Sequence, residues 1–201
     1  MYQKKGELRQ QQIFETAASL FAERGYARTS IRDLSEALEL SKSSLYHYFD
    51  SKEDLLHRLL ADFMDEALAQ IEEISGRDLP PLEKIGAVMR FYTSFFAGSR
   101  HHLTLLVNDL DCLSPVRRDA VVAQERRYVV ALKGILSELK DAGLLRDLPL
   151  SVAVFAFFGM VHYTPKWYRQ DGPVSPADLG LYFQQIFCQG ILADDPPATS
   201  S

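Results

Sequence analysis

A short run of small and basic side chains near the N-terminus is the first group in this sequence whose types and spacing suggest chemistry. Residues 41–44 read Ser-Lys-Ser-Ser, and Tyr46 and His47 follow on the polar side of the same segment. Hydroxyls both donate and accept hydrogen bonds, and lysine donates to guanine or to phosphate. Lys52 lies in the first turn of the next expected helix, where backbone N–H groups already favour a phosphate. These side chains have the chemistry of DNA binding.

The elements that would position these side chains are helices. Apolar residues recur every three or four positions across 13–21, and Gly25 can end that first helix. Ser30 and Asp33 have the spacing of a capping box that opens a second, short helix, and a break follows at 39–41. Two short helices joined by a three-residue break and braced by a longer helix form a helix-turn-helix. Its second helix enters the major groove of DNA.

The rest of the chain is expected to be helical as well. Leu45 and Phe49 face the core of the segment 42–49, and Ser51 with Asp54 forms a second capping box that opens a long helix. Beyond a linker at 75–81, helical patterns cover 82–98, 101–113, 116–142, 150–168 and 175–191. No alternating strand pattern is present, so the predicted fold class is all-α. We expect a DNA-binding domain over 1–52 that extends into the helix to about 74, a larger domain over 75–193, and a flexible tail at 194–201.

Composition and charge exclude several classes of protein. The chain has 201 residues, of which 47% are hydrophobic and 24% charged, so a mainly disordered protein is excluded. The net charge is -5, so any contact with DNA must be local. The N-terminal segment is polar, and the longest apolar stretch, 150–161, is too short to span a bilayer. We therefore expect a cytoplasmic protein with no membrane partner.

Catalytic and metal chemistry find little support. Cys112 and Cys188 lie in no C-x-x-C pair and are expected to be buried small hydrophobes. His101 and His102 are adjacent, so they point to different faces of a helix and cannot clamp one ion. Neither a nucleophile elbow nor a glycine-rich phosphate loop occurs. We expect no enzyme activity, no cofactor and no metal.

Three stretches resemble the DNA-binding domain of the TetR family of transcriptional regulators. They are Phe-Ala-Glu-Arg-Gly-Tyr at 21–26, Thr-Ser-Ile-Arg-Asp-Leu at 29–34, and the block 41–55, which contains Leu-Tyr-His-Tyr-Phe and Ser-Lys-Glu. The resemblance implies that nine positions face DNA: Thr29, Ser30, Ser41, Lys42, Ser43, Ser44, Tyr46, His47 and Lys52. Residues 42–44 would reach bases, whereas Tyr46, His47 and Lys52 would hold phosphates. Glu39 departs from the family, which usually has glycine in this turn, and a positive φ angle there would carry a cost.

The C-terminal helices carry more apolar surface than one core needs. The segment 150–168 is apolar nearly all round, and 179–191 carries a broad apolar stripe. These helices either lie inside the molecule or pair with a second subunit, and the family resemblance implies a homodimer joined by the last two long helices. The candidate interface residues are Phe155, Tyr182, Phe183, Ile186, Phe187 and Gly190.

The same resemblance implies an effector pocket among the middle helices, although aromatic residues at helical spacing are more often core. The candidate pocket residues are Phe91, Phe95, Asn108, Tyr128, Phe158, His162, Tyr163 and Trp167. The segment 167–176 further resembles members that respond to acyl-coenzyme A thioesters. Four arginines could meet the nucleotide phosphates, or could form a solvated face with Asp119 and Glu125. They are Arg117, Arg118, Arg126 and Arg127.

These features together predict a dimeric, ligand-responsive transcriptional regulator. We expect a repressor that a small hydrophobic effector releases from double-stranded operator DNA. An acyl-CoA is one candidate effector, and a drug-like or aromatic compound is the alternative. Activation and ligand-independent regulation stay open. The protein could also belong to another class, as a carrier or enzyme that uses the apolar helices without binding DNA. No catalytic constellation supports this alternative.

Overall fold

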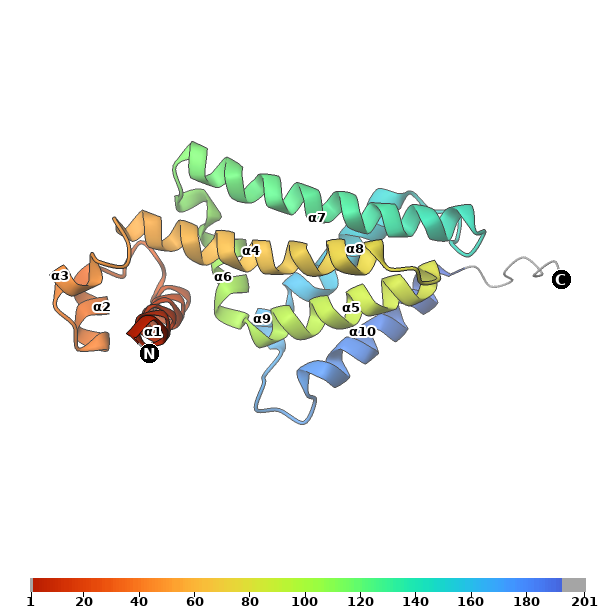
Figure 1. The fold of residues 1–201 in the computed structure, drawn as a ribbon. Helices are drawn as coiled ribbons and strands as arrows, with labels where there is room; N and C mark the ends of the chain where they lie inside the picture. The colour runs from red at the N-terminus through yellow and green to blue at the C-terminus, as the bar shows by residue number, and fades with distance from the viewer. Residues whose placement is uncertain (1, 193–201) are drawn as a thin grey trace. The chain divides into compact units, whose positions relative to one another are not determined.

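The computed structural model describes residues 2–192, with side chains from residue 6 onward, and is all-α as predicted (Figure 1). The helices are α1 (Tyr2–Arg24), α2 (Ile31–Leu38), α3 (Lys42–Leu45), α4 (Lys52–Gly76), α5 (Pro81–Gly98), α6 (Arg100–Asp109), the 3-10 turn η1 (Leu110–Cys112), α7 (Pro115–Asp141), α8 (Leu150–His162), α9 (Thr164–Trp167) and α10 (Pro176–Ile191). Over this range the only β pairing is an isolated bridge between Leu145 and Leu192. The predicted tail, 194–201, lies outside the described residues.

The described chain divides into two compact units. The first holds α1 to α3, the start of α4 as far as Met64, and the segment His101–Ala123. The second holds Asp65–Arg100 and the chain from Gln124 onward. Helices α4 and α7 therefore each contribute residues to both units. The linker predicted at 75–81 consists of the end of α4, a short turn and the first residue of α5.

In the first unit, the chain turns where its residue types predict. Ile13, Ala17 and Phe21 form the fully buried face of α1. Gly25 ends this helix at φ +87°, a left-handed conformation that glycine adopts without steric cost, and its N–H donates to the carbonyl of Phe21 at 2.8 Å. The capping box at Ser30 is confirmed, because the side chains and backbone N–H groups of Ser30 and Asp33 bond reciprocally.

The third helix is shorter than the sequence pattern suggests. A helix was expected over 42–49, but α3 ends at Leu45 and a turn occupies 46–48. Leu45 and Phe49 are both buried, so the turn still anchors both ends of the segment in the core. The burial of these two side chains therefore holds the segment in place even though the helix does not continue to Phe49.

In the second unit, α5 and α10 lie side by side in close contact (Figure 1). A Cβ at Gly180 would lie 3.1 Å from the carbonyl oxygen of Arg90, which is closer than most Cβ contacts, so glycine favours this close approach of the two helices. Arg90 donates to Gln184 at 2.5 Å, and Ser94 donates to the carbonyl of Pro176 at 3.2 Å. These contacts join residues 94 and 82 positions apart in sequence into one layer.

Two predicted helices are interrupted. The segment 150–168 divides at Tyr163 into α8 and α9, because Pro165 has no N–H to continue the helical ladder. The segment 101–113 ends its α-helix at Asp109 and continues as η1.

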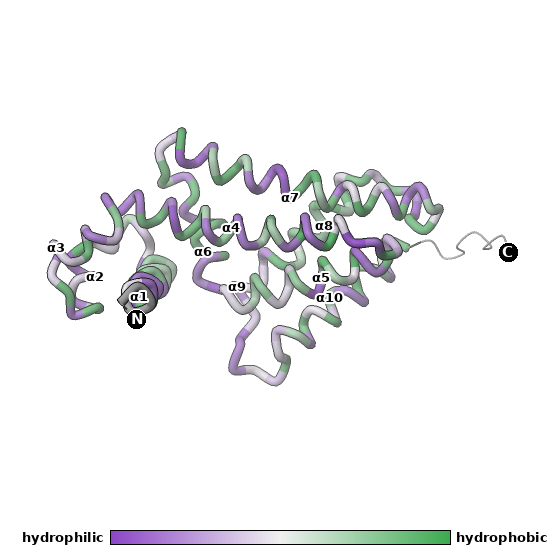
Figure 2. Tube along the Cα trace, in the orientation of Figure 1, coloured by the Kyte–Doolittle hydropathy of each residue, from purple (hydrophilic) through white to green (hydrophobic). Residues whose placement is uncertain are grey.

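Helix α7 alternates apolar and polar residues along its length, as an amphipathic helix does (Figure 2). Its Glu138 pairs with the buried Lys84 of α5 at 3.0 Å.

Candidate functional site

The surface of α3 presents a set of polar side chains. We call Ser41, Lys42, Ser43, Tyr46 and His47 the recognition face, and each of them is exposed. The residues that alternate with them, Leu45 and Phe49, are buried, and Ser44 is half-buried. The buried pair thus orients the segment so that the five predicted side chains point to solvent together.

The three serines of this segment are bonded to one another. Ser41 is the N-cap of α3, and its hydroxyl oxygen accepts a hydrogen bond from the N–H of Ser44 at 3.1 Å. The same oxygen lies 2.8 Å from the hydroxyl oxygens of Ser43 and Ser44. The ammonium group of Lys42 has no hydrogen-bond partner among the described residues. Its ammonium group is therefore the least committed donor at the start of α3.

Thr29 does not belong to the exposed set, so the expectation that its side chain faces DNA is wrong. It is 1% exposed, and its hydroxyl donates to the carbonyl of Gly25 at 3.0 Å, inside the turn after α1. Burying a hydroxyl requires such a partner. Ser30 remains exposed, but its hydroxyl donates to Asp33 at 2.6 Å as part of the capping box. Both residues thus hold α2 in place.

Lys52 lies at the start of α4 and rests against two aromatic rings. Its Nζ atom is 4.1 Å from the ring centre of Tyr26 and 5.9 Å from that of Phe21, which is a cation–π geometry. Partial burial lowers the pKa of Lys52, and the nearby Asp109 opposes that shift. The aromatic rings hold the ammonium group in one place, which suits a fixed contact with a phosphate.

Glu39 adopts the left-handed conformation that its position in the turn predicts. Its φ and ψ angles are 52° and 41°, and it is the only residue other than glycine with a positive φ over the described range. The N–H of Leu40 donates to the carbonyl of Ser35 at 3.0 Å, which closes the end of α2. A side chain with a Cβ destabilises the left-handed conformation. Glu39 is therefore a strained position next to α3, where glycine would adopt the same angles without strain.

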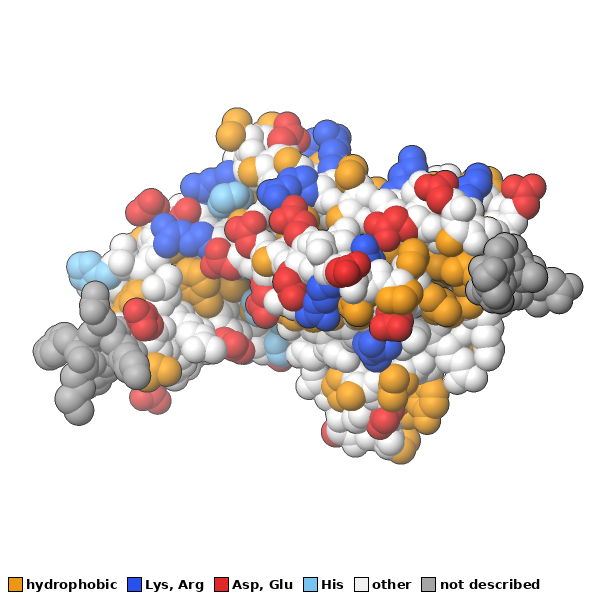
Figure 3. All heavy atoms as spheres, turned by 45° about the vertical axis from the view of Figure 1, so that its right-hand side comes forward, with side chains coloured by type: hydrophobic (Ala, Val, Ile, Leu, Met, Phe, Trp, Pro, Cys, Tyr) orange, Lys and Arg blue, Asp and Glu red, His pale blue; other side chains and the backbone are white. Residues whose placement is uncertain are grey.

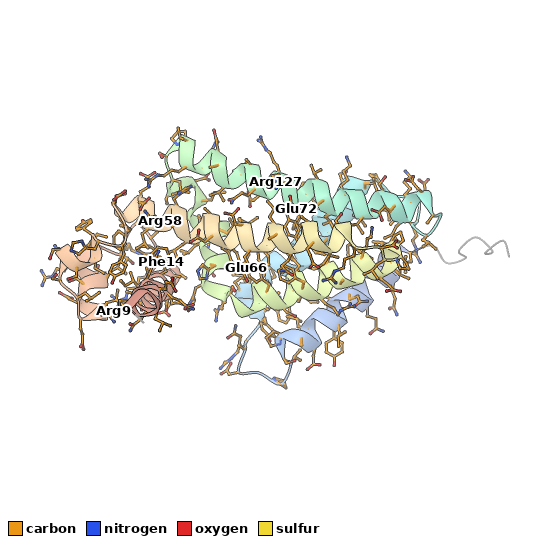
Figure 4. All side chains as sticks on the ribbon, in the orientation of Figure 1. Arg9, Phe14, Arg58, Glu66, Glu72 and Arg127 are labelled. Atoms are coloured by element: carbon orange, nitrogen blue, oxygen red, sulfur yellow. The ribbon has the colours of Figure 1, made fainter. Side chains whose placement is uncertain are left out.

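The start of α4 is tied to the start of α7 by charged groups within the first unit. Glu53 accepts a hydrogen bond from the N–H of Ser114 at 2.9 Å, and this bond lowers the pKa of Glu53. The buried Asp54 pairs with Arg117 at 3.4 Å and with Arg58 at 3.0 Å. Arg58, labelled in Figure 4, also donates to the carbonyl of Tyr48 at 3.1 Å. These bonds fix the turn that follows α3.

A cluster of aromatic and polar side chains in the second unit is the other candidate site. Tyr92 of α5 and His162 of α8 share a hydrogen bond of 2.5 Å. The ring of Tyr128 on α7 lies 5.1 Å from that of Tyr92 and 5.9 Å from that of Phe158. We call Tyr92, Tyr128, Phe158 and His162 the tyrosine–histidine cluster.

Burial controls the charge of this cluster. It lowers the pKa of His162 to about 4, so the imidazole is neutral at pH 7. It raises the pKa values of Tyr92 and Tyr128 well above 10. The hydroxyl of Tyr128 is buried and has no hydrogen-bond partner among the described residues. The cluster is therefore uncharged and holds an unused donor.

The predicted pocket residues are only partly brought together. Tyr128, Phe158 and His162 share the cluster, and Phe91 and Phe95 stack on each other nearby on α5 at 5.2 Å. Tyr163 and Trp167 are 64% and 51% exposed and lie outside the cluster. Asn108 is exposed on α6 and belongs to the first unit, so it is not a member of the cluster. Tyr92 is not among the predicted pocket residues, because periodicity alone does not show which of the adjacent residues 91 and 92 faces His162.

The arginines considered for phosphate binding mostly pair with carboxylates. Arg117 bonds to Asp54, Arg118 lies 3.5 Å from Asp111 and from Asp119, and Arg127 pairs with Glu72 at 2.6 Å. The last pair is labelled in Figure 4, where the two side chains point toward each other between α7 and α4. On the face drawn in Figure 3, basic and acidic side chains are interspersed rather than separated. These pairs favour the solvated-face interpretation.

The segment 167–176 has a clear structural role. The buried Tyr168 donates to the carbonyl of Val174 at 2.9 Å, and Gln170 donates to the carbonyls of Ala97 and Gly98 at the end of α5. Ser175 is the N-cap of α10. The segment thus connects the C-terminal end of α5 with the N-terminal end of α10.

The predicted dimer residues fall into two groups. Phe155, Tyr182 and Ile186 are 65%, 54% and 60% exposed, and Gly190 is exposed as well. Phe183 and Phe187 are buried in their own subunit, so their assignment to the interface is wrong. Adjacent residues such as Tyr182 and Phe183 point to different faces of α10, and only the contacts inside the subunit show which face is covered. Val152 and Leu181, which are not among the predicted interface residues, extend the exposed apolar surface.

Other chemistry is not supported. The adjacent histidines diverge, because His102 stacks on Phe63 while His101 lies 3.9 Å from Glu23. Cys188 is buried as expected, but Cys112 is exposed, which corrects its assignment as a buried hydrophobe. Within the described part of the chain, no group of three or more His, Cys, Asp or Glu could hold a metal ion. No helix in residues 2–192 is long and apolar enough to cross a bilayer.

Comparison with known proteins places this geometry in a family. Residues 13–59 match the profile of the bacterial regulatory proteins of the tetR family, and residues 78–191 match that of the tetracyclin repressor-like C-terminal domain. The HTH-type transcriptional repressor KstR2 of Mycobacterium tuberculosis is 28% identical over 91% of this chain and 92% of its own length.

Two solved structures extend the comparison. A TetR-family transcriptional regulator from Bordetella parapertussis is 35% identical, with a TM-score of 0.79 over 89% of this chain and 93% of that one. AibR, solved in complex with isovaleryl coenzyme A and operator DNA, is 28% identical, with a TM-score of 0.78 over 89% of this chain and 97% of that one. With its helix-turn-helix and its helical C-terminal region both matched, this chain belongs to the TetR family of bacterial transcriptional regulators.

Proposed function

We propose that this protein is a dimeric repressor that binds operator DNA through the recognition face and leaves it when an acyl-CoA thioester binds to the second unit. The observation that carries the DNA-binding part is the recognition face itself. Five exposed polar side chains gather on one short segment, and the buried Leu45 and Phe49 hold them outward. The related KstR2 is named a repressor, which supports repression as the direction of control.

An exposed apolar surface on α8 and α10 supports the dimer. Val152 and Phe155 on α8, and Leu181, Tyr182 and Ile186 on α10, are each more than half exposed. Soluble monomers rarely expose so many large apolar side chains on neighbouring helices. A second copy of the chain would cover them through a two-fold interface, and two recognition faces would then read half-sites about one DNA turn apart.

The effector class rests on one relative and on the tyrosine–histidine cluster. AibR binds isovaleryl coenzyme A, and this chain aligns with it over nearly the whole length. The cluster offers apolar rings with a few polar groups among them, which is the composition of small-molecule sites. Because Arg117, Arg118 and Arg127 are paired with carboxylates, the acyl group rather than the nucleotide would supply most of the recognition.

Release from DNA requires coupling between the two sites. Helices α4 and α7 each run through both compact units, so a ligand that shifts either helix would change the spacing of the two recognition faces. Ligand and operator then weaken each other reciprocally, with a typical coupling of about 1–3 kcal/mol. We expect the protein to act in the cytoplasm, where its operator lies.

The test is fluorescence anisotropy with the DNA upstream of the protein's own gene. The titration is run with and without an acyl-CoA series, and the matching free fatty acids are the control. Tight, salt-sensitive binding that only the thioesters release would support the whole proposal. Binding that ignores every thioester would contradict the effector class and favour a drug-like or aromatic compound, while the DNA-binding part would stand. Absence of specific binding to any upstream fragment would contradict the repressor.

A further inference from the structure

The hydroxyl of Tyr128 is an unusual group in this protein. Tyr128 is 1% exposed, and its hydroxyl is buried without a hydrogen-bond partner among the described residues. A buried hydroxyl without a hydrogen-bond partner destabilises the folded state, so such a group needs an explanation. Its ring is held by Tyr92 and Phe158, at 5.1 Å and 5.9 Å. The ring is thus fixed in place while its polar end remains unused.

The other members of the tyrosine–histidine cluster carry no positive charge at pH 7. Tyr92 and His162 satisfy each other through their hydrogen bond of 2.5 Å, and both lie within the same set of aromatic rings. The imidazole is neutral at pH 7 because of its burial. Glu125 lies one helical turn before Tyr128 on α7, and burial raises its pKa. A carboxylate placed here would lose its hydration and gain no cation in return.

We propose that the tyrosine–histidine cluster is the polar end of the effector site, and that Tyr128 donates a hydrogen bond to an uncharged carbonyl oxygen of the effector. This inference rests on the proposed function and adds the chemical group that the site selects. A carbonyl oxygen satisfies the unused hydroxyl without adding charge. The cluster therefore accepts a thioester or a ketone and discriminates against the free acid of the same chain length.

The selection follows from the cost of leaving polar groups unpaired. A site built to hydrogen-bond a carbonyl disfavours a ligand without one, because its own donor then stays buried and unsatisfied. It disfavours a carboxylate for a different reason, since the anion must be desolvated beside Glu125. The effector would thus act in its activated form, and hydrolysis of the thioester would remove the signal.

The experiment compares two coenzyme A derivatives by isothermal titration calorimetry. One is an acyl-CoA, and the other is the alkyl-CoA thioether of equal length, which lacks only the carbonyl oxygen. The wild type should bind the thioester about fivefold more tightly. Tyr128→Phe removes one oxygen atom and should bind both derivatives alike. Tyr163→Phe is the matched control, because Tyr163 is exposed and lies outside the cluster, and it should keep the wild-type preference.

The outcomes separate this inference from the proposed function. Equal binding of thioester and thioether by the wild type, or a preference that survives in Tyr128→Phe, would overturn the inference and leave the repressor intact. If no coenzyme A derivative binds, the acyl-CoA effector fails, and long-chain methyl ketones are then compared with the matching carboxylates. A preference for the ketone that Tyr128→Phe abolishes would support the inference, and its absence would overturn it. The melting temperature of each variant shows that it is folded.

Discussion

The carboxylate of Glu53, in the first turn of α4, accepts a hydrogen bond of 2.9 Å from the backbone N–H of Ser114, immediately before α7. The two residues are 61 positions apart in sequence. The bond satisfies one of the N–H groups that the start of a helix leaves unpaired, with an acceptor from a different helix. Through it, the helix that follows the recognition face is attached to α7.

Glu53→Gln should weaken this attachment. The hydrogen bond lowers the pKa of Glu53 below its usual value, so the folded state holds the carboxylate ionised more firmly than the unfolded state does. The resulting stability is present above the unfolded pKa of about 4.3 and is lost as the pH falls through the lower folded value. Glu53→Gln should therefore melt at a lower temperature than the wild type at pH 7, and the difference should shrink as the pH falls below about 4.3. A constant difference over this range would contradict the linkage.

Lys42 and Lys52 should have separable effects on DNA binding. Lys42→Ala should change the preferred operator sequence, because its exposed ammonium group lies on the segment that we propose to contact base edges. Lys52→Ala should weaken binding to all sequences and lower the slope of log K against log salt by about one unit, as the loss of one phosphate contact does. Binding selections and salt titrations measure the two effects. An unchanged site for Lys42→Ala, or an unchanged slope for Lys52→Ala, would contradict the respective role.

Glu39→Gly should stabilise the protein and raise its affinity for operator DNA. The residue has a φ of 52°, which glycine adopts without the clash of a Cβ, so the variant should gain about 1 kcal/mol in the free energy of unfolding. Loss of a carboxylate close to α3 should also strengthen binding to the operator. Glu39→Gln, which removes only the charge, separates the two effects, since it should tighten DNA binding without raising the melting temperature. Chemical denaturation and anisotropy are the measurements.

Ile186→Glu should produce monomers. The side chain is 60% exposed in one subunit, so the substitution should leave the fold intact, yet it would place a charge in the proposed interface between two copies. Sedimentation at micromolar concentration should show a dimer for the wild type and a monomer for the variant. Val130→Glu is the control, because Val130 is 69% exposed on α7, away from α8 and α10 in sequence, and should leave the dimer unchanged. A monomeric wild type would remove the dimer from the proposal.

His162 should make the stability of the protein depend on pH between 4 and 6.5. Its pKa is about 4 in the folded state, against 6.5 as its ordinary value, so the unfolded state binds more protons in this range. The free energy of unfolding should fall as the pH is lowered from 6.5 to 4, by at most about 1.4 kcal/mol per pH unit. In His162→Phe that part of the slope should disappear. Urea denaturation across the range tests this, and equal slopes in both proteins would show that the imidazole titrates normally.

The local features of the helix-turn-helix could be predicted from the sequence because neighbouring residues produce them. The capping box of Ser30 and Asp33, the turn at Gly25 and the left-handed Glu39 depend on contacts within a few positions. The block around 41–52 carries the family resemblance, and the exposure of Lys42, Tyr46 and His47 agrees with it, while their contact with DNA stays a prediction. The all-helical fold follows from a periodicity that every amphipathic helix carries.

Tertiary contacts decided which side chains of each helix are buried and which are exposed. Thr29 is polar and lies beside exposed residues, but its hydroxyl donates a hydrogen bond to the carbonyl of Gly25 inside a turn, which no local pattern shows. Phe183 and Ile186 belong to one apolar stripe, and only packing against α5 and α8 separates the buried side chain from the exposed one. The pairing of Tyr92 with His162 joins residues 70 positions apart. Sequence determined the elements and their chemistry, whereas burial, which depends on distant segments, decided which groups remain free to bind.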